Sequence, residues 1–134
     1  MLIRSGLAIR LLGVAELPSV GNPCWAELLS PTELAFCTGL VRVTDHLAAR
    51  VAGKQAVRAV LNLPPQGWSG RDPARAGVLR THDVEIRRVP GSAPQVVLGG
   101  NAERWRQAQG LAPPGVSLSH AAGYAAALAW LPAP

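Results

Sequence analysis

The segment Ser117-Leu118-Ser119-His120 places two hydroxyls and an imidazole within four residues. An imidazole at the end of a strand can act as a general base, a general acid or a phosphate ligand, although it can also be an ordinary structural histidine. Adjacent residues of a strand point to opposite faces, so Ser119 and His120 are not expected to form a nucleophilic pair. The two serines share one face and His120 takes the other.

A second group of polar side chains repeats every four residues. Its members are His46, Arg50, Lys54 and Arg58. On a helix this spacing gives one basic stripe about 18 Å long. The stripe could hold phosphate or carboxylate groups, arginine by a planar fork and lysine as a point charge, or it could be a solvated face. Lys54 is the only lysine, and its small neighbours Ala52, Gly53 and Ala56 indicate that another element approaches closely.

Acidic residues are scarce in this chain of 134 residues. It has 13 Lys and Arg against 8 Asp and Glu, a net charge of +5, and only 16% charged residues. The basic surplus favours an anionic partner. Four Trp, one Tyr and one Phe give few platforms for stacking bases, so we expect no nucleic-acid partner. Asp83 and Glu85 share a strand face that we expect to be solvated.

The composition predicts one folded domain over residues 1–134, since 49% of the chain is hydrophobic. No apolar run reaches the roughly 18 residues of a transmembrane helix, and the first 17 residues do not resemble a signal peptide. Cys24 and Cys37 do not form a local CxxC motif, so we expect two free thiols. These features predict a cytoplasmic protein without a membrane partner.

The elements that must position these side chains follow from periodicity and capping. Ser30-Pro31-Thr32-Glu33 is a capping box that should begin a short helix, and Thr44 and Asp45 should cap a long helix to about Asn62. The other expected elements are strands at 2–12, 82–89, 95–98, 115–120 and 123–131, an exposed loop at 64–78, and a helix capped by Asn101. One long helix packed on an antiparallel sheet makes the fold class α+β.

Five segments in order resemble motifs of the holo-acyl-carrier-protein-synthase type of 4′-phosphopantetheinyl transferase. They are Gly6–Ile9 (G-I-D-I in the family), Leu29–Leu34 (L-T-x-x-E-L), Leu47–Ala56 (L-A-x-R-F-A-A-K-E-A), Asp83–Ile86 (D-I-E-I) and Val116–His120 (V-S-L-S-H). They span nearly the whole chain. The resemblance implies a phosphopantetheinyl-transferase-like domain and a homotrimer with sites between subunits.

The family transfers the phosphopantetheine arm of coenzyme A to a serine of an acyl carrier protein. By resemblance, Arg50, Lys54, Ser119 and His120 occupy places that bind coenzyme A phosphates, and we add Arg58 and Ser117 as phosphate or substrate ligands. Family members hold Mg²⁺ through an aspartate of the first strand and a glutamate of the long helix. These positions carry Ala8 and Gln55 here, which are poor ligands for a hard cation, so we expect no metal site.

The departures at Ala8 and Gln55 leave three hypotheses open. The first is a repurposed enzyme in which His120, Lys54 and Gln55 perform metal-free cyclisation, dehydration or isomerisation of an acyl or polyketide-like substrate, free or carrier-bound, without a cofactor. The second is a holo-acyl-carrier-protein synthase that uses coenzyme A and Mg²⁺. The third is a non-catalytic binder of the carrier protein or of coenzyme A. We expect an enzyme, and the first hypothesis is our sequence-based prediction.

Overall fold

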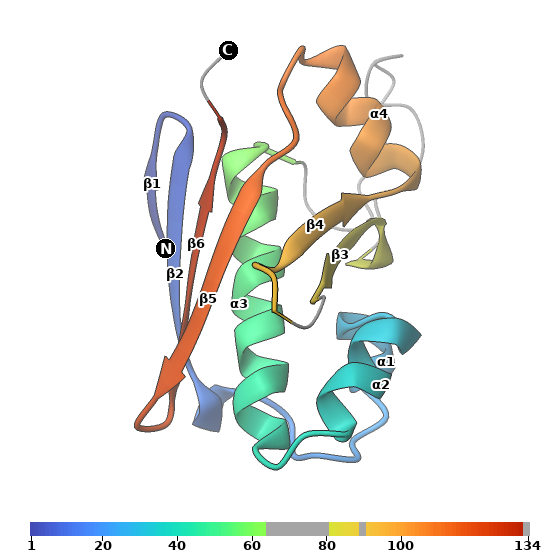
Figure 1. Ribbon diagram of the computed structural model, residues 1–134, viewed down its shortest axis with the longest axis vertical. Helices are drawn as coiled ribbons and strands as arrows, with labels where there is room; N and C mark the ends of the chain where they lie inside the picture. The colour runs from blue at the N-terminus through green and yellow to red at the C-terminus, as the bar shows by residue number, and fades with distance from the viewer. Residues whose placement is uncertain (64–80, 89–90, 133–134) are drawn as a thin grey trace.

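Four antiparallel strands form the main sheet of the computed structural model, which describes residues 1–63, 81–88 and 91–132. The strands are β1 (Leu2–Arg4), β2 (Leu7–Gly13), β5 (Gly115–Ala121) and β6 (Tyr124–Trp130). Their order across the sheet is β1-β2-β6-β5, so a strand from the first part of the chain and the last strand lie side by side in its centre (Figure 1). In this order β2 and β6 become neighbours, Ala8 facing Ala129 and Arg10 facing Ala127.

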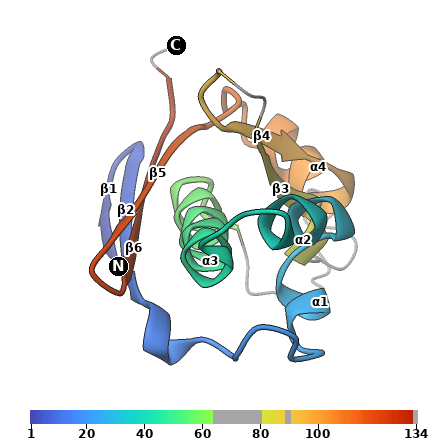
Figure 2. The same cartoon turned by 60° about the horizontal axis from the view of Figure 1, so that its bottom comes forward.

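The long helix α3 (Val43–Val60) lies between this sheet and a second layer (Figure 2). The second layer consists of α1 (Trp25–Leu28), α2 (Pro31–Thr38), α4 (Gly100–Ala108) and the antiparallel pair β3 (Val84–Arg87) and β4 (Gln95–Leu98). Short 3-10 turns lie at Val14–Glu16 and Thr81–Asp83. The predicted α+β class, with one long helix packed on an antiparallel sheet, is confirmed.

Alanines line the face of the main sheet that meets α3. Ala8, Ala125, Ala127 and Ala129 occupy alternate positions of β2 and β6 on this face and are at most 2% exposed. Because alternate residues of a strand point to one face, this pattern presents a row of methyl groups to the helix. A helix can approach such a surface closely.

The predicted capping box of α2 is confirmed. The Ser30 hydroxyl accepts a hydrogen bond from the backbone N–H of Glu33, and the Glu33 carboxylate accepts one from the backbone N–H of Ser30. Pro31 occupies the first helical position, where its missing N–H costs nothing. The structure also contains the predicted hairpin of the last two strands, which turns at Ala122 and Gly123 with positive φ angles of 52° and 81°.

Several predicted boundaries are wrong for local reasons. Residues 2–12 are not one strand, because Gly6 adopts a φ of 72° and turns the chain into the β1–β2 hairpin. Helix α3 begins at Val43 after Arg42, before the expected caps. Helix α4 begins at Gly100 after Gly99, so Asn101 lies inside it. The predicted strand 82–89 shortens to β3.

The predicted exposed loop at 64–78 lies outside the described residues. Among the helices that the structure describes, none is long and apolar enough to cross a membrane.

The close approach predicted around Lys54 is found at Gly53. A Cβ built on Gly53 would lie 2.4 Å from Ile86 Cδ1 and 2.7 Å from Leu118 Cδ2, and Ile86 is only 1% exposed. Helix α3 therefore contacts β3 and β5 through its own backbone at this point.

We predict that Gly53→Ala lowers the free energy of unfolding by about 1 kcal/mol, because overpacking a filled core outweighs the gain in helix propensity. Urea denaturation measures the change. The control is Gly39→Ala, where an added Cβ would make only ordinary contacts with the backbone oxygens of Phe36 and Ala35. A Gly53→Ala protein more stable than the wild type would contradict this packing.

Candidate functional site

The buried carboxylate of Glu33 joins three elements beneath the candidate site. Its Oε1 accepts from Lys54 Nζ at 2.5 Å, and its Oε2 accepts from the backbone N–H of Ile86 at 2.9 Å. Lys54 Nζ also donates to the Leu28 carbonyl at 3.2 Å. Glu33 and Lys54 are 1% and 3% exposed. Burial lowers the pKa of Lys54, and the neighbouring Glu33 carboxylate partly opposes this shift.

A second carboxylate, which we expected to face solvent, meets the same helix terminus. The Ser30 hydroxyl donates to Glu85 Oε1 at 3.0 Å, and Arg87 bonds to Glu85 Oε2 at 3.0 Å. The solvated position expected for Glu85 is therefore wrong, because α2 packs its N-terminus against β3. Sequence spacing alone gives no sign of this contact, which joins residues 55 positions apart.

The strand-end imidazole of His120 lies at the N-terminal part of α3. Its ring centroid is 5.0 Å from that of His46, with the rings nearly perpendicular, and its Nδ1 lies 3.7 Å from an Asp45 carboxylate oxygen. Burial lowers the pKa of His46, and electrostatic repulsion from His120, Arg50 and Arg88 lowers it further, whereas Asp45 raises it. The group is thus a cluster of basic side chains with one acid.

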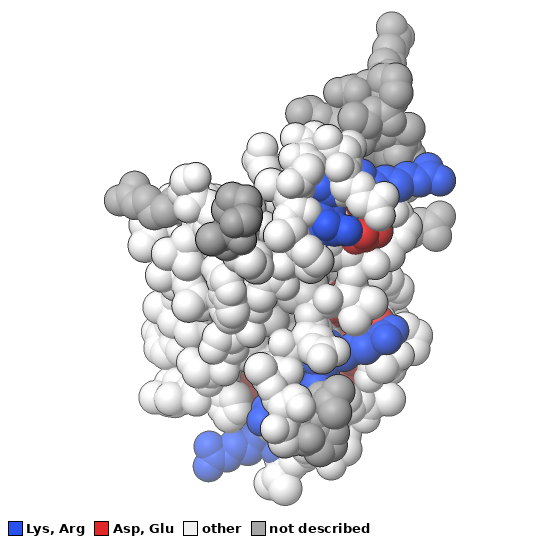
Figure 3. All heavy atoms as spheres, turned by 45° about the horizontal axis from the view of Figure 1, so that its top comes forward, with Lys and Arg blue, Asp and Glu red and all other residues white. Residues whose placement is uncertain are grey.

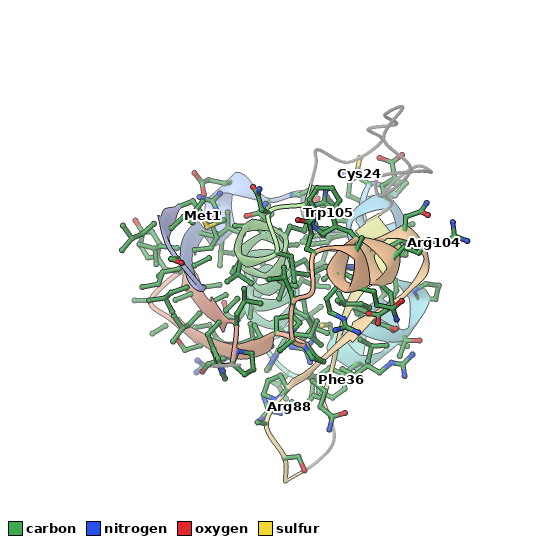
Figure 4. All side chains as sticks on the ribbon, turned by 90° about the horizontal axis from the view of Figure 1, so that it is seen from above. Met1, Cys24, Phe36, Arg88, Arg104 and Trp105 are labelled. Atoms are coloured by element: carbon green, nitrogen blue, oxygen red, sulfur yellow. The ribbon has the colours of Figure 1, made fainter. Side chains whose placement is uncertain are left out.

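The Arg50 guanidinium is buried next to this cluster, with a relative exposure of 2%. It lies over the Phe36 ring at 4.8 Å, and burial lowers its pKa, an effect that the nearby Arg88 reinforces. Phe36 and Arg88 lie on the same side of the molecule in Figure 4. Arg50 Nε and Nη2 have no hydrogen-bond partner among the described residues. Buried donors without partners are rare, and a guanidinium fork fits a phosphate or carboxylate.

Gln55 faces β2, away from Lys54. Its Oε1 accepts from Arg10 Nε at 2.7 Å. Ala8 lies on the same face of β2, two residues before Arg10, and is fully buried. Arg10 is a residue that our sequence analysis did not single out, since its partner is 45 positions away.

The predicted site residues therefore divide into separate groups. His120 and Arg50 lie toward the first half of α3, Lys54 is enclosed by the second layer, and Gln55 meets the sheet. Arg58 is half-buried, and the charge of Asp83 acts on it. Ser117 and Ser119 are exposed on the outer face of the sheet, opposite His120 as expected. Within one chain the structure does not unite the predicted catalytic residues His120, Lys54 and Gln55.

The two positions at which the resemblance implies Mg²⁺ ligands do not fit that ion. Ala8 has no donor atom, and the amide oxygen of Gln55 is engaged by a guanidinium. No group of three or more His, Cys, Asp or Glu residues that could hold a metal occurs in the described part of the chain. Mg²⁺ is usually bound by one or two carboxylates, whereas Ala8 offers no side-chain oxygen and Gln55 only a neutral one.

Comparisons with known proteins agree on one family. The chain is 35% identical over 104 residues to a holo-acyl-carrier-protein synthase of Moorella thermoacetica, covering 78% of this chain and 73% of that protein. It is 32% identical over 128 residues to the synthase of Desulforudis audaxviator, covering 92% and 89%. No protein-family model matches the chain.

Solved structures share the fold. The Helicobacter pylori synthase, in complex with coenzyme A, has a TM-score of 0.69 and 22% identity and covers 94% of this chain and 99% of its own. The Neisseria meningitidis synthase has a TM-score of 0.72 and 18% identity and covers 98% and 100%.

Because the Glu33–Lys54 pair is buried, we predict that replacing one partner lowers the free energy of unfolding much more than replacing both. Lys54→Met should lower the free energy of unfolding by about 3–5 kcal/mol, because it leaves a buried carboxylate without its counter-charge. Glu33→Gln combined with Lys54→Met should recover part of the loss. Urea denaturation measures both.

The matched control is Arg87→Met, which breaks the Arg87–Glu85 pair, whose arginine side chain is 52% exposed. This change should cost no more than about 1 kcal/mol. A Lys54→Met protein as stable as the control would show that the Lys54 ammonium is not buried as described.

Proposed function

The chain belongs to the holo-acyl-carrier-protein synthase family, and from this premise we propose that it transfers phosphopantetheine from coenzyme A to a serine of an acyl carrier protein. Nothing in the comparisons supports the hypothesis of a repurposed, metal-free cyclisation, dehydration or isomerisation of a polyketide-like substrate. We therefore replace that sequence-based prediction with the second hypothesis.

The reaction follows from the chemistry of the two substrates. The serine oxygen attacks the phosphorus of the coenzyme A pyrophosphate that carries the pantetheine arm. A P–O bond to serine forms, the bond between the attacked phosphorus and the bridging oxygen breaks, and 3′,5′-ADP leaves with that oxygen. The serine proton passes to a base or to the departing phosphate. The protein must hold a highly charged anion and position the attacking hydroxyl.

The observation that carries the proposal is the Arg50 guanidinium. Two of its donor nitrogens are buried and have no partner among the described residues, while the Arg88 guanidinium adds positive charge nearby. Desolvating a guanidinium is costly unless an anion pairs with it. A phosphate of coenzyme A would satisfy the unpaired nitrogens, and His120 would supply a further phosphate contact or the proton acceptor.

A second candidate, a non-catalytic binder of coenzyme A or of the carrier protein, is favoured by Ala8 and Gln55 at the family's metal-ligand positions. The two candidates share the anion site and differ only in whether the bond to serine forms. The transfer reaction therefore decides between them.

We predict that the chain, mixed with apo carrier protein and coenzyme A, raises the carrier mass by one phosphopantetheine arm. Arg50→Gln should lower the transfer rate about 10- to 100-fold, because a charge-assisted hydrogen bond contributes ~1.5–3 kcal/mol. Mass spectrometry measures the product.

Arg104→Gln is the control, since Arg104 lies exposed on α4 and points away from the core (Figure 4). The transfer rate of this variant should equal that of the wild type. A carrier mass that does not change, with coenzyme A still bound, would reject the transferase in favour of the binder.

We also propose the predicted homotrimer, since the outer face of the main sheet exposes apolar side chains. Leu2, Ile9, Leu11, Tyr124 and Trp130 are between 37% and 60% exposed there. The side of the molecule formed by this sheet shows few charged side chains (Figure 3). A surface of this kind marks an interface, and copies of the chain packed on it would bring site residues of different subunits together.

The free cysteines, one exposed and one buried, support a reducing compartment such as the cytoplasm.

A charge placed on this sheet face should dissociate the oligomer. Leu11→Arg puts a guanidinium on a side chain that is 60% exposed in one chain, so its own fold should survive. Light scattering after size exclusion should give the mass of three chains for the wild type and of one chain for the variant. A monomeric wild-type protein, or a trimeric Leu11→Arg protein, would contradict the interface.

A further inference from the structure

The inner face of β2 carries a guanidinium where the metal ligands of the family would meet. Ala8 and Arg10 point to the same face, since they are two residues apart on a strand. Arg10 reaches across to α3, where its Nε donates to Gln55 Oε1 at 2.7 Å. Positions 8 and 55 are thus close to one arginine, Arg10, which lies outside all the motifs described in the sequence analysis.

Arg10 has further donors available at this place. A guanidinium has five N–H groups and a fixed positive charge, and the bond to Gln55 uses the single N–H of Nε. In the described part of the chain, the structure gives Arg10 no other hydrogen bond and no ion pair. The two terminal nitrogens are therefore available, in the fork geometry that binds two oxygens of a phosphate.

The substitutions at positions 8 and 55 are consistent with this arrangement in chemical terms. Two carboxylates would pair with Arg10 and cancel its charge, unless a divalent cation offset them. An alanine and a neutral amide leave that charge uncompensated. Gln55 also provides the oxygen acceptor that orients the guanidinium. An alanine, lysine or arginine at position 55 would provide no such acceptor. The three residues together provide one net positive charge for an anion.

We propose that Arg10, oriented by Gln55, binds the pyrophosphate of coenzyme A and takes the place of Mg²⁺, so that this chain binds its donor substrate without a divalent metal. The proposal rests on the proposed function, because coenzyme A is the donor in that reaction. Arg10 contacts the substrate oxygens and exchanges no proton with them. It neutralises charge on the pyrophosphate as the P–O bond to 3′,5′-ADP breaks, which is one of the tasks of a metal ion in phosphoryl transfer.

The first measurement is coenzyme A binding by calorimetry with the full chain, in EDTA and in Mg²⁺. The wild type should bind equally well in both. Arg10→Gln should weaken binding in EDTA about 10- to 100-fold, the effect of losing hydrogen bonds to a charged group. The control Arg87→Gln removes the same charge from the exposed end of β3 and should leave the affinity unchanged. Wild-type binding that requires Mg²⁺, or Arg10→Gln binding as tight as the control, would overturn the proposal.

A second variant restores the acids and removes the arginine: Ala8→Asp, Arg10→Thr and Gln55→Glu combined. Circular dichroism checks that it folds. Its binding of coenzyme A should be weak in EDTA and strengthen at least about tenfold in Mg²⁺, since two carboxylates and the pyrophosphate provide the oxygens that the ion prefers. Equal binding in both buffers would contradict the exchange of an arginine for a metal.

The transfer assay separates this proposal from the proposed function. Carrier modified in EDTA by the wild type supports both. Carrier modified only in Mg²⁺ overturns the metal-free site and leaves the transferase intact. Metal-free, Arg10-dependent binding of coenzyme A with no carrier modified supports the site and rejects the transferase.

Discussion

The carboxylate of Glu33 fixes the arrangement on which the candidate site depends. It accepts hydrogen bonds from its own helix terminus, from Lys54 on α3 and from Ile86 on β3, all in a buried setting. Because a helix turns about 100° per residue, tying Lys54 to α2 sets the rotation of the whole of α3. Arg50, one turn earlier, then lies over Phe36 of α2, and Gln55 faces β2. A single ion pair thus decides which charged side chains reach the candidate site.

The few acidic residues of the chain leave several basic side chains of the candidate site without a carboxylate partner. Among the described residues, Glu33 pairs with Lys54, Glu85 with Arg87 and Glu103 with Arg106. These pairs use the three glutamates of the second layer and leave Arg50, His46 and Arg10 with few carboxylates around them. A site of this composition favours an anion with several phosphate groups.

Local signals predicted much of the fold. The capping box at Ser30, the length of α3 and the strand pair that ends the chain follow from residues close together in sequence, and the small residue Gly53 correctly indicated a close approach. The basic stripe was harder to interpret, since a sequence cannot tell a solvated helix face from one covered by a second layer. Arg50 and Lys54 are buried because α2 covers them. The family motifs indicated only indirectly, by placing Arg50 and Lys54 in a binding site, that this helix face is not solvated.

The contacts that define the site join distant segments, and composition and periodicity do not predict these. Arg10 and Gln55 are 45 residues apart, and Ser30 and Glu85 are 55 apart. In the sequence, Ala8 and Gln55 are seen only as positions that lack the family's carboxylates, because a resemblance compares one position at a time. In the structure both positions lie beside Arg10, so the three residues form one group. The strand order β1-β2-β6-β5, which sets β2 against α3, makes this possible.

The proposed Arg10 site would let this member of the holo-acyl-carrier-protein synthase family hold coenzyme A with a guanidinium, at the positions where the family resemblance implies metal ligands. The most direct measurement is a crystal structure of this chain with coenzyme A, grown in EDTA. We expect pyrophosphate oxygens within hydrogen-bond distance of the Arg10 terminal nitrogens, with Gln55 still bonded to Arg10 Nε. A pyrophosphate that does not contact Arg10 would contradict this metal-free site.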